Sequence, residues 1–170
     1  MKFQNERELP VSVTTAWAAL NDDAILHRCI PGCESLQRAE PDVLKAVVVL
    51  AIGPVKARFN GTVRFEDIQP LKGYRMVFEG NGGIAGFSKG TAEVQLAENA
   101  DGTTKLAYVA EAQIGGKIAQ LGSRLIDAAS QKITGQFFAR FEQELSNACA
   151  VEAAAPLNAS DEAGPWLRSC

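Results

Sequence analysis

The sequence predicts an α+β fold in which a curved antiparallel sheet wraps around one long C-terminal helix, with two short helices after the first strand. Apolar and polar residues alternate along most of the chain from the Pro31-Gly32 turn almost to residue 115, which is the period of half-buried strands. From Lys117 the period becomes that of an amphipathic helix. Helix-capping side chains follow the first alternating segment, which places the two short helices there.

The N-terminal segment is expected to contribute the first strand and both short helices. Phe3 to Leu9 is predicted to be a strand that ends at Pro10, since proline lacks the amide proton that a strand needs. Ser12 offers a hydroxyl that can cap one short helix. Asn21-Asp22 can cap a second helix, which is expected to end near Arg28.

The middle of the chain is predicted to form neighbouring antiparallel strands. The clearest strand runs from Val55 to Glu66, where apolar or small residues fall on one face and polar residues on the other. The same alternation recurs from Tyr74 to Phe78, from Ser88 to Leu96 and from Leu106 to Ile114. Connections rich in Gly, Pro, Asn and Asp provide the turns that hairpins require, at 53–54, 70–73 and 99–102.

The C-terminal third is predicted to be one long helix followed by a tail. Apolar residues recur every three or four positions from Ile118 to Leu145, so a helix of about thirty residues, roughly 45 Å long, is expected. Residues 1–147 are therefore predicted to form one domain. Residues 148–170 are Ala-rich and lack a sustained period, which predicts a flexible tail. In it, Trp166-Leu167 could touch a partner or a bilayer, with a disordered end as the alternative.

The composition is that of an ordinary globular protein. The 170 residues are 46% hydrophobic and 22% charged, and a net charge of −3 argues against nucleic acid as the main partner. No apolar run approaches the roughly 20 residues of a membrane-spanning helix. The polar segment from Met1 to Glu8 does not resemble a signal peptide. We therefore expect a cytoplasmic protein whose four cysteines are reduced.

Small residues are concentrated on the two surfaces that should face each other inside the domain. Several inward positions of the strands are Gly or Ala, and the start of the long helix adds Ala119, Gly122 and Ala128. Protein interiors are close-packed, and a sizeable void costs on the order of 1 kcal/mol or more, so this pattern predicts a cavity kept for a ligand. Alternatively, the small residues let the helix lie close to a strongly bent sheet. In both cases the helix from Phe137 onward is expected to be solid core.

The predicted void lies beside the first half of the long helix. Its expected walls are the inward positions of the strands and of this half of the helix, namely Ala57, Phe59, Gly61, Val63, Met76, Phe78, Gly90, Ala92, Leu106, Tyr108, Ala110, Ala112, Ile118, Leu121, Gly122, Leu125 and Ala129. A glycine-rich loop is expected at the pocket mouth, through Gly82, Gly83, Gly86 and Phe87, with a plain hairpin connection as the alternative.

No motif in the chain indicates a cofactor or a catalytic centre. Gly80 to Gly86 matches a dinucleotide-binding fingerprint by letter, but it precedes an alternating strand and not the helix that would bind the phosphates. His27, Cys29 and Cys33 are spaced like metal ligands, yet zinc sites need further ligands, and a small buried Cys29 is the alternative. With a single histidine, no conventional catalytic set is present. Tyr108 could take part in proton chemistry, although a pocket wall is the plainer interpretation.

Four segments together resemble one family. They are Ile30 to Glu34 (IPGCE), Gly53 to Phe59 (GPVKARF), Ala85 to Gly90 (AGFSKG) and, most specifically, Ala112 to Asp127 (AQIGGKIAQLGSRLID). In this order they resemble the CoxG family of carbon monoxide dehydrogenase subunits, over about residues 1 to 147. That family belongs to the START-like, SRPBCC superfamily, so the resemblance implies the helix-grip (START/Bet v1-like) fold, whose members hold hydrophobic ligands between sheet and helix.

The resemblance also implies a function. It implies a non-catalytic accessory protein for a molybdenum-containing carbon monoxide dehydrogenase or related hydroxylase, acting in assembly, membrane recruitment or electron delivery. Because such an enzyme must pass electrons to a lipid-soluble carrier, the expected ligand is a quinone or another isoprenoid lipid. The protein would then be cytoplasmic or peripheral at the inner face of the cell membrane. A cyclase- or hydrolase-like enzyme on the same fold, or a pure protein-interaction module, is the alternative.

Overall fold

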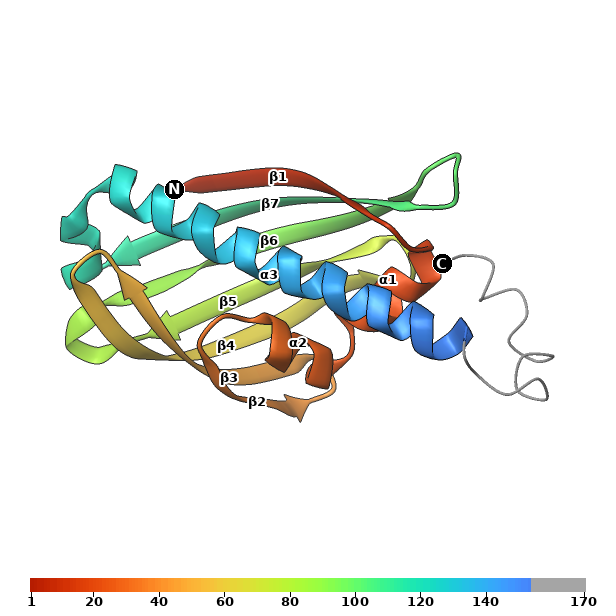
Figure 1. Ribbon diagram of the computed structural model, residues 1–170. Helices are drawn as coiled ribbons and strands as arrows, with labels where there is room; N and C mark the ends of the chain where they lie inside the picture. Colours follow the sequence, from red (N-terminus) through yellow and green to blue (C-terminus); the bar gives the residue numbers. More distant parts are fainter. Residues whose placement is uncertain (154–170) are drawn as a thin grey trace.

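A computed structural model describes residues 1–153, and the side chains of residues 1–147. In this part of the chain, one sheet of seven antiparallel strands curves around a long helix (Figure 1). The strands are β1 (Lys2–Leu9), β2 (Cys33–Glu40), β3 (Val43–Ile52), β4 (Val55–Gln69), β5 (Gly73–Asn81), β6 (Phe87–Glu98) and β7 (Thr104–Gly115). The helices are α1 (Val13–Leu20), α2 (Asp23–Cys29), α3 (Ser123–Ala153) and the short 3₁₀ helices η1 (Gly83–Ala85) and η2 (Lys117–Leu121).

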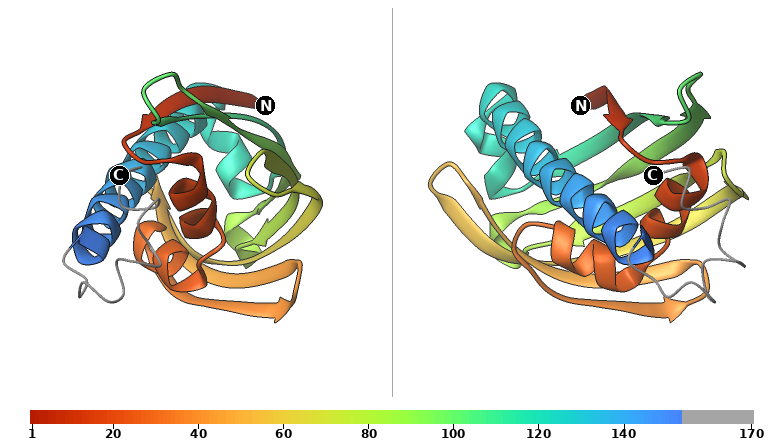
Figure 2. Two further views of the ribbon diagram at one scale, coloured as in Figure 1. Left: turned by 90° about the vertical axis from the view of Figure 1, so that its right-hand side faces the viewer. Right: turned by 45° about the vertical axis from the view of Figure 1, so that its right-hand side comes forward.

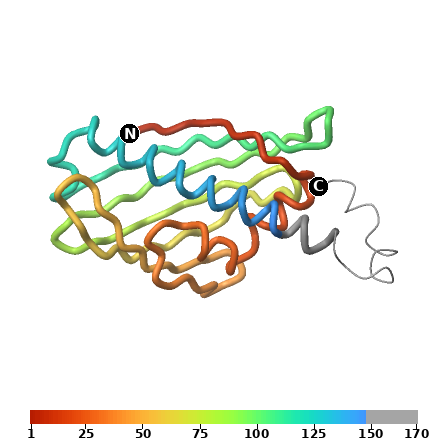
Figure 3. The backbone as a smooth tube through the Cα atoms, in the orientation of Figure 1, coloured from red at the N-terminus to blue at the C-terminus, as the bar shows by residue number. Residues whose placement is uncertain are grey.

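The strands follow the order β1-β7-β6-β5-β4-β3-β2 across the sheet. All strands except β1 lie beside their neighbours in sequence, whereas β1 crosses over to pair with β7, and the two run side by side in Figure 3. The register places Asn5 and Val94 on either side of Tyr108, and Met76 opposite Ala92. Since directly paired residues share a face, these side chains belong to one surface of the sheet.

The concave face of the sheet holds all three α-helices (Figure 2). The main core forms between this face, α1 and the second half of α3, where Leu9, Phe141 and Leu145 are fully buried. A second, smaller cluster at the other end of the sheet joins Phe59, Ala85 and Ile118. The interior is therefore packed at both ends.

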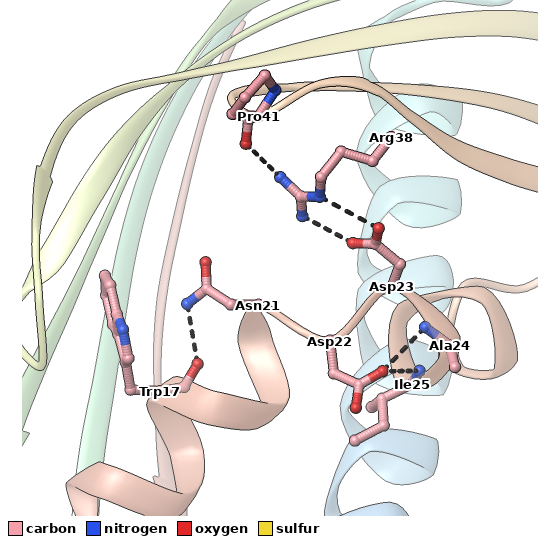
Figure 4. Close-up of polar contacts among 8 residues, drawn as sticks. All are labelled: Trp17, Asn21, Asp22, Asp23, Ala24, Ile25, Arg38 and Pro41. Atoms are coloured by element: carbon pink, nitrogen blue, oxygen red, sulfur yellow. Dashed lines mark hydrogen bonds and ion pairs between the residues drawn. The ribbon is translucent and has the colours of Figure 1, made fainter.

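Both short helices are capped by side chains, and a forked ion pair also holds α2; Figure 4 shows the α2 cap and this ion pair. The Ser12 hydroxyl caps α1, and the Asp22 carboxylate accepts hydrogen bonds from two amides at the start of α2. At the start of α2, Arg38 of β2 donates hydrogen bonds to both carboxylate oxygens of Asp23, at 2.7 and 3.1 Å. Arg38 also donates to the carbonyl oxygen of Pro41 at 2.8 Å. These contacts fix α2 against the edge of the sheet.

The predicted fold class is confirmed, with two differences around the long helix. The sequence predicts that the helix begins near Lys117, but residues 117–121 form the separate 3₁₀ helix η2. Gly122 has a φ of +90°, which is not a helical conformation and which other residues rarely adopt, so it separates η2 from α3. At the other end, α3 continues to Ala153, beyond the predicted domain boundary at residue 147. The remaining tail, with Trp166-Leu167, lies outside the described residues.

One of the predicted small positions has a packing role. A Cβ atom added at Gly90 would lie 1.9 Å from the carbonyl oxygen of Glu111 in the adjacent strand. Only glycine fits this close approach of β6 to β7. At Gly61, by contrast, the nearest atom would be 3.6 Å away, which is an ordinary contact. The small residue at Gly90 is therefore explained by the approach of two strands, not by the approach of the helix to the sheet, and Gly61 has no such packing constraint.

Candidate ligand-binding cavity

An apolar chamber of about 290 Å³ lies between the concave face of the sheet and the middle of α3. Its walls come from the sheet, from all three α-helices and from the turn after α2, and no wall residue is charged. They are Leu20, Leu26, Ile30, Leu36, Leu44, Ala46, Val63, Phe65, Tyr74, Met76, Ala92, Val94, Leu106, Tyr108, Thr134, Phe137 and Phe138. Such a surface suits an apolar ligand, because it offers burial and few hydrogen-bonding groups.

The polar side-chain groups of the chamber wall are three hydroxyls, on Tyr74, Tyr108 and Thr134. The Tyr74 ring packs edge-on against Trp17 and Phe65, with ring centroids 5.8 and 5.2 Å apart. Burial raises the pKa of Tyr74 to about 12, so this hydroxyl stays protonated at neutral pH. The wall thus contains neutral hydrogen-bonding groups and no fixed charge.

A larger and more polar groove, of about 1010 Å³, lies between β1 and α3. It is lined by Lys2, Phe3, Gln4, Asn5, Arg7, Phe78, Tyr108, Ala110, Asp127, Ser130, Gln131, Ile133 and Thr134. Tyr108 and Thr134 line both the groove and the chamber, so the two cavities adjoin at these side chains. Tyr108 also stacks on Phe138, with centroids 6.2 Å apart.

Arg7 is a charged side chain on the face of β1 that lines this groove. Its guanidinium carbon lies 5.1 Å from the centre of the Phe138 ring, a cation–π contact. Its Nε atom is buried, and no residue among 1–147 accepts a hydrogen bond from it. Arg7 therefore lies where the polar groove meets the aromatic wall of the apolar chamber.

The structure brings some of the predicted wall residues together and separates others from them. Val63, Met76, Ala92, Leu106 and Tyr108 line the chamber. Phe78 and Ala110 line the adjoining groove together with Tyr108. Lining neither cavity are Ala57, Phe59, Gly61, Gly90, Ala112, Ile118, Leu121, Gly122, Leu125 and Ala129. Contact of any of these residues with a ligand stays a prediction.

The chamber lies farther along α3 than the small residues led us to expect. The expected void was beside Ile118 to Ala129, with solid core from Phe137 onward, whereas Phe137 and Phe138 themselves line the chamber. At the start of the helical segment, Phe59 and Ile118 fill the space in the second cluster. Beyond Phe138 the expectation of solid core agrees with the structure, since Phe141 and Leu145 are fully buried.

The glycine-rich loop closes one end of the sheet and lines neither cavity. A Cβ atom added at Gly82 would lie 2.5 Å from the Phe59 ring, and one at Gly86 would lie 2.3 Å from the carbonyl oxygen of Gly115. Gly83 and Phe87 are exposed. The loop therefore packs on the second cluster, and a role of Gly82, Gly83, Gly86 and Phe87 at a pocket mouth stays a prediction.

Sequence reasoning missed the chamber walls that come from α1, α2 and the middle of α3. Leu20, Leu26 and Ile30 are apolar positions on or just after short helices, and nothing in their local pattern distinguishes a cavity wall from core. Arg7 did carry a signal. Strand alternation places it on the same face as Phe3 and Leu9, which is unusual for an arginine.

The residues with metal-ligand spacing do not converge. Cys29 is fully buried, and burial raises the pKa of its thiol to about 11, so it remains a thiol at neutral pH. The Cys33 thiol donates to the carbonyl oxygen of Ser35 at 3.3 Å, and His27 is exposed. Within residues 1–153, no three His, Cys, Asp or Glu side chains gather as a metal site would require.

The chain is similar to one protein family and to several solved structures. The family model for CoxG, described as a subunit of carbon monoxide dehydrogenase, matches residues 8–146. A conserved protein of Geobacillus kaustophilus is 30% identical, with a TM-score of 0.82, over 86% of this chain and 96% of that one. Ara h 8.0201 is 20% identical, with a TM-score of 0.60, over 86% and 98% of the two chains. No match was found among curated proteins.

An enzyme also shares the fold. The Zhui aromatase/cyclase of Streptomyces sp. R1128 has a TM-score of 0.64 at 7% identity, over 86% of this chain and 93% of the other. At so low an identity the likeness concerns the fold alone, and that fold is the Bet v1-like one predicted from the sequence.

Proposed function

This chain belongs to the CoxG family of carbon monoxide dehydrogenase subunits, and from that premise we propose that it is a non-catalytic accessory protein which binds a hydrophobic small molecule. The observation that carries the proposal is the uncharged chamber between the sheet and α3. An apolar cavity of this size costs stability when empty, and an apolar ligand offsets that cost by replacing the missing contacts.

A quinone or another isoprenoid lipid is the proposed ligand. The volume of the chamber is just below roughly 300 Å³, the lower end of the usual range for small-molecule pockets. The chamber therefore suits a ring system or a short apolar segment. The adjoining groove offers room for further parts of a longer molecule. The family premise adds that a molybdenum carbon monoxide dehydrogenase must pass its electrons to a carrier, and a lipid-soluble carrier fits an apolar chamber.

The proposed partner is a carbon monoxide dehydrogenase-type enzyme, served in assembly, membrane recruitment or electron delivery. A candidate surface for membrane recruitment lies at the end of the domain that contains η1, and we call it the η1 end surface. It is formed by five exposed residues, Ile84, Phe87, Lys117, Arg124 and Leu125. η1 contacts η2, which contacts the start of α3, and Ile84 is 93% exposed. Exposed apolar side chains beside basic ones match the chemistry of an anionic bilayer surface. No helix within residues 1–153 is long and apolar enough to cross a membrane.

The enzyme alternative predicts convergent acid and base groups inside the cavity. The chamber wall contains only hydroxyls as polar side-chain groups, and the raised pKa of Tyr74 makes it a poor proton donor or acceptor at neutral pH. A pure interaction module would have no use for an apolar chamber. Both points favour ligand binding.

Extraction of the native ligand tests this proposal. The full chain is purified without detergent, extracted with organic solvent and analysed by mass spectrometry. We expect a stoichiometric apolar molecule. We expect its loss from Ala92→Phe, which places a phenyl ring in the chamber, and its retention in Val109→Phe, at a residue that is 40% exposed. Recovery of only polar metabolites, or of nothing, from the wild-type protein would contradict the proposal.

A further inference from the structure

Arg7 is the one basic side chain in the groove that reaches the aromatic wall of the chamber. It lies over the face of Phe138, and Phe138 lines the chamber. Two of the other charged residues of β1 have partners: Glu6 pairs with Lys105 at 3.2 Å, and Glu8 accepts a hydrogen bond from Asn99 at 2.6 Å. Lys2 also lines the groove, but its side chain is exposed. Arg7 therefore stands apart from the ion pairs of its own strand.

The Arg7 guanidinium has hydrogen-bonding capacity that the protein leaves unused. Within residues 1–147 it forms no ion pair, and its buried Nε atom donates to no acceptor. Asp127 lines the same groove, but its carboxylate is held by Gln131 at 3.0 Å and forms no ion pair with Arg7. Burying a donor without an acceptor destabilises a protein, and the cation–π contact with Phe138 does not satisfy the N–H group. An acceptor brought by a ligand would remove this deficit.

The position of Arg7 specifies what kind of ligand would bring that acceptor. Tyr108 and Thr134 line both cavities, so a molecule that extends from the chamber into the groove would pass these two side chains. We propose that Arg7 donates a hydrogen bond to an oxygen of the bound ligand, so that the protein selects apolar molecules that carry a carbonyl or carboxylate group. This inference rests on the proposed function, because it assumes that the chamber holds a ligand. It adds that the ligand is amphipathic and names the residue that recognises its polar end.

Matched probes test whether Arg7 recognises an oxygen or merely supports the fold. Menadione and 2-methylnaphthalene share a ring system but differ in the quinone carbonyls. Dodecanoate and dodecanol share a chain but differ in the carboxylate. Dissociation constants are measured by titration calorimetry for the wild-type chain, for Arg7→Met and for Arg64→Met, which removes an exposed arginine of β4.

We expect Arg7→Met to weaken binding of at least one of the probes that carry a carbonyl or carboxylate group, by about 3- to 10-fold for menadione and by 10-fold or more for dodecanoate. The matching reference probe should change by less than about 2-fold, and Arg64→Met should change neither. If only the affinity for menadione falls, Arg7 recognises a neutral carbonyl group. If only the affinity for dodecanoate falls, Arg7 recognises an anionic headgroup. Arg7→Lys, which keeps the charge, should recover part of the affinity for dodecanoate.

A thermal unfolding measurement on the ligand-free variants separates recognition from structural support. Because Arg7 leaves a buried donor unsatisfied, Arg7→Met should unfold at the wild-type temperature or above it. Equal weakening of both members of each probe pair, or no weakening of any probe, would overturn the inference while leaving the proposed function standing. If the wild-type chain bound none of the four probes, the proposed function itself would be contradicted.

Discussion

Replacing Ala92 with Phe distinguishes an open chamber from a tightly packed core, because the two predict opposite changes in stability. Ala92 is almost fully buried in β6, lies opposite Met76 and Ala110 in the neighbouring strands, and lines the chamber. If the chamber of about 290 Å³ is open in the ligand-free protein, the added phenyl ring enters existing space. Burial of a Phe side chain contributes up to about 1.5–3 kcal/mol, so the free energy of unfolding should be unchanged or should rise within that range.

In a tightly packed core the same substitution would lower the free energy of unfolding by about 1–3 kcal/mol. Each kcal/mol moves the Tm of a domain of this size by about 2–4 °C, so the two cases differ by several degrees in opposite directions. The assay is urea unfolding of the delipidated chain followed by circular dichroism, with Val109→Phe as the exposed control. A loss of about 1 kcal/mol or more in Ala92→Phe, with the control near wild type, would refute the open chamber.

Other residues of the structure yield four further predictions, on Tyr74, Phe141, Asp22 and Ile84. Because burial raises the pKa of Tyr74 to about 12, the folded protein keeps a proton that the unfolded chain loses above about pH 10. The free energy of unfolding should therefore fall by roughly 2–3 kcal/mol as the pH rises from 10 to 12, and Tyr74→Phe should remove this part of the loss in alkaline urea titrations. Phe141→Ala, at a fully buried site, should cost about 3–5 kcal/mol in the same assay at neutral pH. Asp22→Ala removes the cap of α2 and should cost about 1 kcal/mol, which a Tm measurement would reveal. Ile84→Asp should reduce flotation with phosphatidylglycerol vesicles and leave Tm unchanged; undiminished flotation would exclude the η1 end surface as the contact.

The fold was predictable because its signals are local. Alternation assigned the inward face of the strands, and it placed Met76, Ala92 and Tyr108 on the surface that lines the chamber. Capping side chains located both short helices, since Ser12 and Asp22 act within one turn of their own chain. Each of these features depends on neighbouring residues in sequence and little else.

The position of the chamber was not predictable in the same way, because it depends on distances between elements. α2 is held by the Arg38–Asp23 ion pair at one end and by Arg28, which pairs with Glu144 of α3 at 2.8 Å. These long-range contacts place apolar residues of α2 on the chamber wall, and no short pattern encodes them. Conversely, the sequence pattern predicts empty space at Gly90, whereas in the structure this glycine allows two strands to approach closely.

A crystal structure of the chain purified with its native ligand tests the central claim most directly. We expect ligand density in the chamber, in contact with Val94, Phe137 and Phe138, with a ligand oxygen within hydrogen-bonding distance of Arg7. Density for the ligand elsewhere on the protein, with the chamber closed by side chains, would contradict the claim.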